Sequence, residues 1–422
     1  MTKDKWMKVA EICGWFLFGI YFCVEMFRFG LSMKRTLALG VVCIFSILIH
    51  CYKSRRDGDY IKRIFGLKQK PDRDYSYDWL RVLAVVMVIV THAIQVDLSV
   101  GLITGEKKTY VLTVLYMLCL ACNLIYVMLS GALLIPYREE KLADFYLKRA
   151  TKVIFPMAVY FVFYLWQNRE LDLISWETIK SIFVRLCQGE TPESPHYWLM
   201  YTFLSVYIVI PFFRYMFKDM SYRRVTAVTI IALVLMTLNL FSPIKFKVSS
   251  FLGSWEGVAI IGYWVTRPET KKYYRMLIGL GVAAFVLMAV FIGCDLDYRT
   301  LCCNASPVMT LISTGTFATV FLGHKFFHKG NVVLKILSKY SYSLILIHWW
   351  TLHWITRGRY DIQVLQHHGL GLFLSLGVTL LVSLIAAILI DNYVLTFVQQ
   401  VFDWILEGIE KGIAKVKKEH CA

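Results

Sequence analysis

Long apolar runs, separated by short polar segments, are the feature that most constrains this chain. Most of them reach the ~17 to 25 residues that a helix needs to cross a bilayer. With 58% hydrophobic and 18% charged residues, the composition excludes a soluble globular or disordered chain. We therefore predict an all-α fold, a polytopic transmembrane helical bundle of about twelve spans in a lipid bilayer. The candidate spans lie near residues 10–30, 35–52, 78–96, 110–135, 153–167, 197–217, 225–242, 251–266, 276–294, 306–327, 340–356 and 369–394.

The distribution of basic residues predicts the orientation of the bundle. Lys and Arg number 46 against 29 Asp and Glu, a net charge of +17. The surplus gathers in alternate loops, as the positive-inside rule describes, and both termini are then cytoplasmic. Because topology accounts for the charge, we expect no nucleic-acid partner. The predicted inside segments are 53–77, 136–152, 218–224, 267–275, 328–339 and the C-terminal tail.

The loops divide the chain into four parts. Residues 1–52 hold two leading transmembrane helices, and 53–77 form a basic cytoplasmic linker. A ten-helix membrane domain follows over 78–398, and 399–422 form a basic cytoplasmic tail. The longest predicted outside loop, 167–196, carries apolar residues at helical spacing, which predicts a helix lying on the membrane surface.

The third span carries two ionisable residues at membrane depth, Arg81 and His92. Burying a charge there costs ~3 kcal/mol or more, so such residues are candidates for function. Their spacing puts both on one helix face, ~16 Å apart along the axis. Arg81 has a structural alternative, snorkelling with Asp78 as its ion-pair partner. His92 either hydrogen-bonds a neighbouring helix or transfers protons.

Two later spans add further candidates. His348 lies about two turns into its predicted span. The adjacent Trp349 and Trp350 are typical of interfacial aromatic residues. Glu256 lies near the predicted outer end of its span, beside Gly257, which permits close helix approach; its alternative is a bond to a neighbouring helix.

A basic cluster marks the predicted inner surface. Lys148, Arg149 and Lys152 precede an apolar span, and Ser130 ends an earlier apolar run. Such clusters often serve topology alone. The functional alternative is phosphate binding, because arginine makes bidentate bonds to phosphate oxygens.

Metal and redox chemistry find little support in the sequence. Cys119 and Cys122 form a C-x-x-C within an apolar span, without a second pair. The pairing of the adjacent Cys302 and Cys303 stays open. Because no zinc-hydrolase, Walker or nucleophile-elbow motif is present, we expect no metal cofactor.

Five short motifs, in order over about residues 75–395, resemble those of the acyltransferase-3 family of integral membrane acyltransferases. Individually they are weak, and their shared order on a ten-helix core is more specific. Three depart from the family pattern: Lys152 replaces an arginine, Tyr126 replaces a phenylalanine, and the motif from Ser341 to His348 lacks its middle aromatic. The matching segments are Asp78-x-x-Arg81-x-x-Ala84 with His92, Tyr126 to Ser130-Gly131, Arg149 with Lys152 before Pro156, His196-Tyr197-Trp198, and Ser341-Tyr342 with His348.

The resemblance implies transfer of an acyl group, most often acetyl from cytoplasmic acetyl-CoA, to a hydroxyl of an extracytoplasmic or lipid-linked cell-surface glycan. It implies a multi-pass protein of a cell membrane, here the bacterial cytoplasmic membrane. In this scheme His92 is the general base. The candidate catalytic residues are His92, Arg81, His348 and Glu256; the donor-binding ones are Arg81, Arg149, Lys152, Ser130 and Tyr342; the acceptor-binding ones are His196 and Trp198.

A transporter or flippase for a polar solute or lipid-linked sugar is the main alternative, because it would use the same buried polar residues. The inverted repeats and broken helices common in transporters are not evident. A sensory or scaffolding domain is a third interpretation, disfavoured because no soluble partner domain is seen. The sequence leaves the acceptor, the acyl group and the oligomeric state open.

Overall fold

The computed structural model describes residues 19–20, 33–68, 73–99, 106–167, 175–189, 191, 194–241, 251–303, 305–353 and 371–420. All regular structure within these ranges is helical, which confirms the predicted all-α fold. Nearly all of the first predicted span, near 10–30, lies outside the described residues.

The first half of the chain builds the helices that carry His92 and the basic cluster. A π-helical segment, η1, joins α7 to α8, and a short 3-10 turn, η2, precedes α10. The elements are α2 (Met33–Arg56), α3 (Tyr60–Ile64), α4 (Ser76–Ser99), α5 (Glu106–Cys119), α6 (Ala121–Leu134), α7 (Leu142–Arg149), η1 (Ala150–Ile154), α8 (Phe155–Gln167), α9 (Trp176–Gln188), η2 (Pro195–Tyr197) and α10 (Trp198–Phe217).

The second half supplies the helices that enclose the first. A second π-helical segment, η7, joins α18 to α19. The elements are α11 (Tyr222–Phe241), α12 (Trp255–Val265), η4 (Pro268–Tyr273), α13 (Tyr274–Gly293), α14 (Tyr298–Leu301), α15 (Pro307–Leu322), α16 (His324–Phe327), α17 (Val332–Thr351), α18 (Gly371–Leu389), η7 (Ile390–Leu395) and α19 (Thr396–His420).

Within the described residues, seven helical stretches are long and apolar enough to cross a membrane, and Pro307–Leu322 is a shorter apolar helix. The protein is therefore a multi-pass membrane protein by length and composition. The total of twelve spans and the cytoplasmic side of the termini stay predictions. The long stretches are Ser76–Gln95, Glu106–Leu134, Leu142–Gln167, Pro195–Phe217, Tyr222–Leu240, Pro268–Gly293 and Leu372–Ile409.

The basic cluster lies on a helix rather than in the loop predicted at 136–152. The helix starts at Leu142 and runs through the π-helical segment Ala150–Ile154 into α8. Pro156 has no N–H to donate to the carbonyl of Lys152, and the wider π turn ends just before it. The helix therefore starts at Leu142, about three turns before the start near residue 153 that the sequence predicts.

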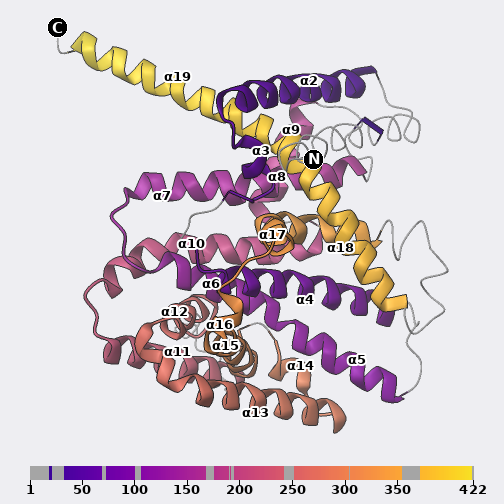
Figure 1. The fold of residues 1–422 in the computed structure, drawn as a ribbon, viewed down its shortest axis with the longest axis vertical. Coiled ribbons are helices and arrows are strands. Elements are labelled where there is room, and N and C mark those ends of the chain that lie inside the picture. The colour runs from indigo at the N-terminus through magenta and orange to yellow at the C-terminus, as the bar shows by residue number, and fades with distance from the viewer. Residues whose placement is uncertain are drawn as a thin grey trace.

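Helix α4 lies at the centre of the bundle, against α5, α6, α15, α17 and α18. Figure 1 shows α4 and α6 in the middle of the molecule, with α2 and α19 at one end of its long axis and α13 at the other. Helices α6 and α12 pack closely. A Cβ on Gly131 would lie 1.8 Å from the carbonyl oxygen of Ala259, and one on Gly262 would lie 2.1 Å from that of Met128. Close approach thus depends on these two glycines.

Gly257, which the sequence suggested for close helix approach, has a different neighbour. A Cβ on Gly257 would lie 1.9 Å from the carbonyl oxygen of Leu252, which precedes the same helix. The missing Cβ therefore leaves room for that carbonyl. Gly257 thus fits the chain entry into α12, and its Cβ position also lies 3.1 Å from the terminal methyl of Met236 in the neighbouring helix α11.

The helix predicted within loop 167–196 is α9. Ser175 caps its start by accepting the Thr178 N–H at 3.1 Å, and Gly189 ends it with φ +74°. None of its residues is buried, and its apolar side chains Trp176, Ile179 and Phe183 are exposed. Such a helix suits the surface of a bilayer, where apolar side chains meet lipid.

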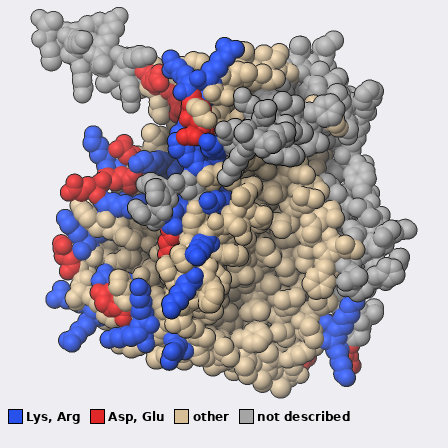
Figure 2. Space-filling view, in the orientation of Figure 1, with Lys and Arg blue, Asp and Glu red and all other residues tan. Residues whose placement is uncertain are grey.

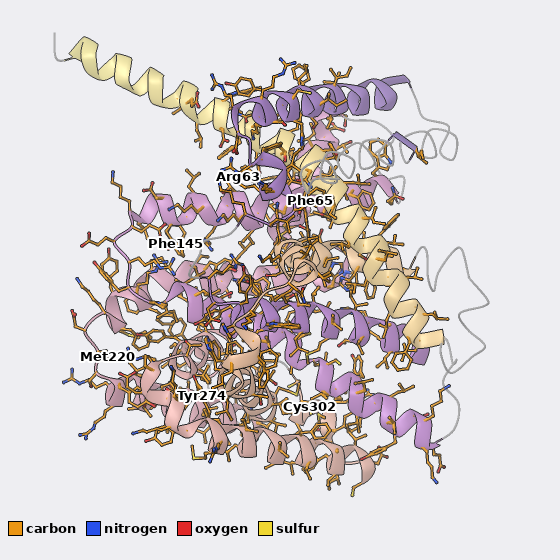
Figure 3. The ribbon with its side chains drawn as sticks, in the orientation of Figure 1. Arg63, Phe65, Phe145, Met220, Tyr274 and Cys302 are labelled. Carbon is orange, nitrogen blue, oxygen red and sulfur yellow. The ribbon has the colours of Figure 1, made fainter. Side chains whose placement is uncertain are left out.

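The second leading helix packs on the end of the chain. His50 of α2 lies 2.5 Å from the carbonyl oxygen of Asn392 and stacks on Tyr393. The Tyr340 hydroxyl donates to the carbonyl of Ile64 at 2.7 Å, so the linker is fixed to α17. Figure 3 shows Arg63 of this linker just below α2.

Charged side chains are unevenly distributed over the surface. Figure 2 shows Lys and Arg, with some Asp and Glu, gathered mainly on one side of this view, and a broad uncharged face beside them. A smaller charged group lies at the lower right, where α5 begins at Glu106. A wide uncharged face bounded by charge is the surface expected of helices in lipid.

Candidate active site

Three imidazoles from three separate segments meet inside the bundle. His92 comes from α4, His196 from the turn before α10, and His348 from α17. The ring centroid of His348 lies 5.1 Å from those of both His92 and His196, and the His92 and His196 centroids are 6.4 Å apart. His196 and His348 are 4% and 0% exposed. We call these three residues the histidine cluster.

The two buried imidazoles each have one nitrogen bonded to backbone. The Nδ1 atom of His348 lies 2.8 Å from the carbonyl oxygen of Ile345 and 3.2 Å from that of Leu344. The Nε2 atom of His196 lies 3.2 Å from the carbonyl oxygen of Leu346. Carbonyl oxygens only accept, so these nitrogens carry the N–H. The other nitrogens, Nε2 of His348 and Nδ1 of His196, are buried and have no hydrogen-bond partner within the part of the chain that the structure describes.

His92 has the same arrangement but faces a cavity. Its Nδ1 atom lies 3.1 Å from Oε1 of Gln95, one turn further along α4. With the amide oxygen as acceptor, Nδ1 carries the N–H and Nε2 keeps a free lone pair. His92 lines a cavity and is partly exposed, whereas the other two members of the cluster are buried. Its lone pair is thus the one placed to take a proton from a bound molecule.

Tyr164 of α8 fixes the turn of α17 that carries His348. Its hydroxyl accepts the Trp350 N–H at 3.1 Å and donates to the Leu346 carbonyl at 2.9 Å. Leu346 also accepts from His196. One carbonyl therefore ties α8, α17 and the turn before α10 together, and it holds His196 and His348 in register.

Trp349 closes one side of the cluster. Its ring centroid lies 5.1 Å from that of His92, edge to face, and 5.9 Å from that of His196. On its other side it lies 4.0 Å from His353. An aromatic wall limits the positions that a substrate can take beside His92.

The cavity beside His92 continues into a larger one. The inner cavity has a volume of about 290 Å³, and its lining includes His92, His196 and Trp349. The second has a volume of about 670 Å³. Both are lined by Gln95, Tyr116, Leu120, Asn123 and Trp198, so one passage leads to the histidine cluster.

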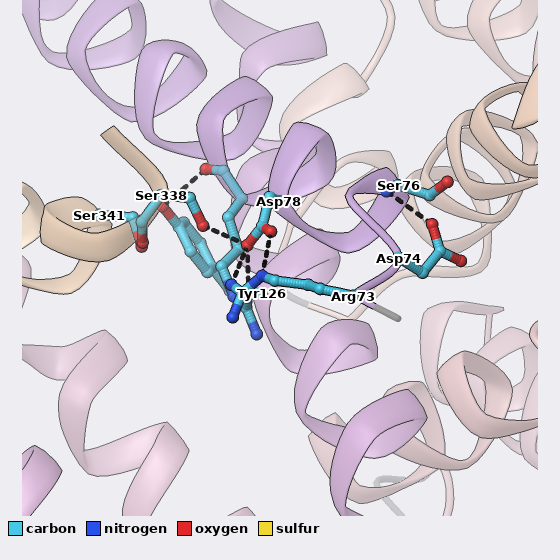
Figure 4. A network of polar contacts seen from close by, with 8 residues as sticks. Arg73, Asp74, Ser76, Asp78, Tyr126, Ser338 and Ser341 are labelled. Atoms are coloured by element: carbon cyan, nitrogen blue, oxygen red, sulfur yellow. Dashed lines mark hydrogen bonds and ion pairs between the residues drawn. The ribbon is translucent and has the colours of Figure 1, made fainter. Parts of the chain in front are cut away.

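Arg81, at the other end of α4, belongs to an ionic network around Asp78, which Figure 4 labels together with Arg73 and Ser338. The buried carboxylate of Asp78 accepts from Arg81 at 2.8 Å, from Arg73 at 2.6 and 2.7 Å and from Ser338 at 2.5 Å. The predicted Asp78–Arg81 pair is thus present. Two guanidinium groups on one carboxylate leave a net positive charge, and the Arg81 side chain is still 27% exposed.

Helix α6 connects this network to the basic cluster. The Tyr126 hydroxyl donates to the Arg81 carbonyl at 3.2 Å, and Ser130, one turn on, lies 3.4 Å from the Tyr207 hydroxyl. The Arg149 guanidinium lies 5.8 Å from the Tyr207 ring centroid. Its Nε is buried and has no hydrogen-bond partner among the described residues. An unpartnered buried guanidinium nitrogen is a donor available to an anion.

The other two donor-side candidates, Tyr342 and Lys152, differ in whether their polar groups are used within the protein. The Tyr342 hydroxyl is used within the protein, because it donates to the Val153 carbonyl of the π-helical segment at 3.1 Å. Lys152 is exposed. Tyr342 thus supports the segment between Arg149 and α8, while the Lys152 ammonium is free to meet a ligand at the surface.

Two predicted site residues lie away from the cluster. Trp198 is 44% exposed, lines both cavities and packs on Trp255 at 5.8 Å between centroids. Glu256 follows Trp255, lies beside Ser205 of α10 and lines neither cavity. The structure therefore brings His92, His196 and Trp198 to one passage, places His348 behind them against the two other imidazoles, and leaves Glu256 outside.

Sequence reasoning missed four residues of the site. Gln95 was detectable, because it lies one turn from His92 on the same face. Tyr164 and Tyr207 carried no local signal, since their partners are distant in sequence. Trp349 was interpreted as an interfacial aromatic. Among the described residues, no group of three or more His, Cys, Asp or Glu side chains has the arrangement of a metal site.

The histidine cluster, its cavity and the polytopic helical fold define a membrane-embedded site equipped for proton transfer. A family profile described as an acyltransferase domain, that of the acyltransferase-3 family, matches residues 74–391. The chain therefore belongs to the acyltransferase-3 family and is an acyltransferase of that family. No curated protein and no solved structure matches it.

Proposed function

We propose that the protein transfers an acetyl group from cytoplasmic acetyl-CoA to a hydroxyl of an extracytoplasmic or lipid-linked cell-surface glycan, in the cytoplasmic membrane of a bacterium. The main support is the His92 imidazole, whose Nδ1–H is held by Gln95 and which lines a cavity. A neutral imidazole in this form is suited to act as a general base.

In the proposed reaction, Nε2 of His92 removes the proton of the acceptor hydroxyl as its oxygen attacks the thioester carbonyl. A tetrahedral intermediate forms, and the carbon–sulfur bond then breaks. The imidazolium returns the proton to the departing thiolate, so the products are an acetyl ester and CoA. Gln95 stabilises the imidazolium, because its amide oxygen accepts the Nδ1–H throughout.

Arg81 and Arg149 are the proposed donor-binding residues, with Lys152 at the surface. Arg149 offers a buried Nε that no described residue bonds, and Arg81 belongs to a network with net positive charge. Arg81 and His92 share α4 at an axial distance of ~16 Å. That distance is of the order of an extended pantetheine arm. A nucleotide bound at the arginines would therefore present its thioester to His92.

The test is acetyl-CoA turnover by the purified protein, with and without a glycan acceptor, compared with His92→Ala. We expect transfer to be lost in the variant while folding and expression are retained. His328→Ala, which changes a histidine outside the cluster, is the matched control. Near wild-type turnover of His92→Ala would remove His92 from the mechanism.

The same preparation separates an enzyme from a carrier. In proteoliposomes, a transporter or flippase would move the glycan without acetyl-CoA and without forming an ester. Acetyl-CoA-dependent ester formation that requires His92 supports the enzyme. Glycan movement without any ester would contradict it.

A further inference from the structure

The larger cavity has a lining that suits a sugar. Trp198 offers an aromatic face, and Thr113, Tyr116 and Asn123 offer hydrogen-bonding groups. Cavities that bind sugars pair an aromatic surface with a few placed polar groups, and about 670 Å³ lies within the range of small-molecule sites. The residues that it shares with the histidine cavity lead from it to His92.

The charge of this lining is one-sided. Among the described residues that line the two cavities, Arg299 is the ionised side chain and there is no Asp or Glu. Arg299 belongs to the short helix α14 and is exposed. The nearby Asp297 does not line the cavity, and its carboxylate accepts the Thr300 N–H at 3.1 Å. The Arg299 guanidinium interacts with the side chain of Tyr298, which lines the same cavity, and with the charge of Asp297, and its five N–H groups leave donors for a bound anion.

We propose that the larger cavity binds an acceptor sugar that carries an anionic group, a carboxylate or a phosphate, and that Arg299 pairs with this group. This inference rests on the proposed function, because it names the class of acceptor. Arginine suits this role, since its planar guanidinium makes two parallel hydrogen bonds to either group. The anionic end is then held at α14, and the hydroxyl to be acetylated points along the shared passage to His92.

Arg299 is separate from the donor machinery. It lies on α14, whereas the donor-side arginines lie on α4 and α7. A substitution of Arg299 is therefore expected to change acceptor binding without changing the donor reaction. Acetyl-CoA hydrolysis without acceptor provides that internal control.

The first experiment measures KM and kcat for three matched acceptors: methyl glucoside, methyl glucuronide and methyl glucoside 6-phosphate. In the wild type we expect one of the two anionic acceptors to have the lowest KM of the three. Comparing the glucuronide with the 6-phosphate shows whether the site prefers a carboxylate or a phosphate. Arg299→Gln should raise that KM about tenfold and leave kcat and the neutral acceptor unchanged. Arg299→Lys should recover part of the loss, because it keeps the charge but not the bidentate geometry.

A binding measurement covers the case in which none of these compounds is acetylated. Cys303 lines the cavity and is exposed, so N-ethylmaleimide can report occupancy, with the modified peptide measured by mass spectrometry. Burial raises the pKa of Cys302 to about 12, and its label is followed separately. Anionic sugars should slow Cys303 labelling at least twofold in the wild type and not in Arg299→Gln.

The outcomes separate the two proposals. If acetyl-CoA turnover depends on His92 but neutral and anionic sugars perform alike in both assays, the anionic acceptor is excluded and the acetyltransferase stands. If anionic sugars protect Cys303 through Arg299 but no acetyl-CoA turnover occurs, the anion site stands and the acetyltransferase fails. An unchanged KM and unchanged protection in Arg299→Gln would overturn the role of Arg299.

Discussion

The Nδ1 atom of His92 lies 3.1 Å from the side-chain oxygen of Gln95, one turn away on the same helix. This contact selects the tautomer in which Nε2 is the base, and it fixes the ring orientation. Gln95 is therefore a positioning residue for His92.

Replacing Gln95 tests this relationship. Gln95→Leu removes the acceptor oxygen, and we expect kcat to fall about 10- to 100-fold because the ring loses its fixed tautomer. Gln95→Glu keeps an acceptor oxygen, so it should retain more activity and move the pH profile of kcat to higher pH, since a carboxylate favours the imidazolium. Equal losses and identical pH profiles in both variants would reduce Gln95 to a cavity-lining residue.

The Tyr164 hydroxyl provides a second test. Tyr164→Phe removes the hydroxyl that bonds both the Trp350 N–H and the Leu346 carbonyl in the buried interior, which costs about 1 to 3 kcal/mol. We expect a lower melting temperature together with a lower kcat, because His196 and His348 lose their common anchor. Tyr201→Phe, which removes a hydroxyl bonded to Leu186, is the control. It should lower the melting temperature without a matching loss of kcat.

The sequence predicts the fold class well, because the length and period of apolar runs are local properties. It predicts helix boundaries less well where backbone chemistry intervenes. Pro156 follows a π-helical segment, and the helix extends back to Leu142 through residues that are too basic to suggest a span. The surface helix α9 was predictable from spacing alone.

Prediction of the site residues likewise succeeds for local motifs and fails for contacts between distant segments. His92, His196 and His348 each fall in a short motif that the sequence displays, but only the fold brings them within 6.4 Å of one another. Tyr164 carries no motif, and its role follows from a contact 186 residues away in sequence, with Trp350. Pairwise geometry between distant segments is not encoded in local pattern, so such residues are found only in the structure.

Replacing Arg149 or Arg81 should weaken CoA binding in both cases, but only the Arg81 variant should also lose stability. Arg149→Ala removes a guanidinium with an unpartnered Nε, so we expect CoA binding measured by calorimetry to weaken about tenfold with little change in melting temperature. Arg81→Ala also breaks the pair with Asp78, and it should both weaken binding and lower the melting temperature. The exposed Lys325→Ala is the matched charge control. Unchanged dissociation constants in both arginine variants would leave the phosphate hypothesis without support.

Because α6 packs closely on α12, a larger side chain at their contact should strongly destabilise the protein. Gly262→Ala would place a methyl group 2.1 Å from the Met128 carbonyl oxygen, so the helices must separate. We expect the free energy of unfolding to fall by about 1 to 3 kcal/mol or more, which is the cost of overpacking a core. Gly279→Ala, with nothing within 4 Å of the added carbon, is the control and should fold normally. The measurement is the yield of monodisperse protein after extraction, together with its melting temperature.

Glu140, between α6 and α7, should make a pH-dependent contribution to the stability of the fold. Its carboxylate accepts from Arg214 at 2.8 Å and from Lys148 at 2.7 Å, and these bonds lower its pKa from 4.5 to about 2. Because the folded state favours the ionised form, the stabilisation is fully present above the ordinary pKa of 4.5 and is lost as the pH falls towards 2. At the surface we expect about 1 kcal/mol or less.

The check is the difference in melting temperature between the wild type and Glu140→Gln as a function of pH. The difference should be constant from neutral pH to about pH 5 and should shrink steadily below that, because protonated Glu140 resembles glutamine. Glu139→Gln, at the exposed neighbouring carboxylate, should show no such trend. A difference that is independent of pH down to the acid limit would mean that the ion pairs with Arg214 and Lys148 contribute nothing, and that the substituted amide merely packs differently from the carboxylate of Glu140.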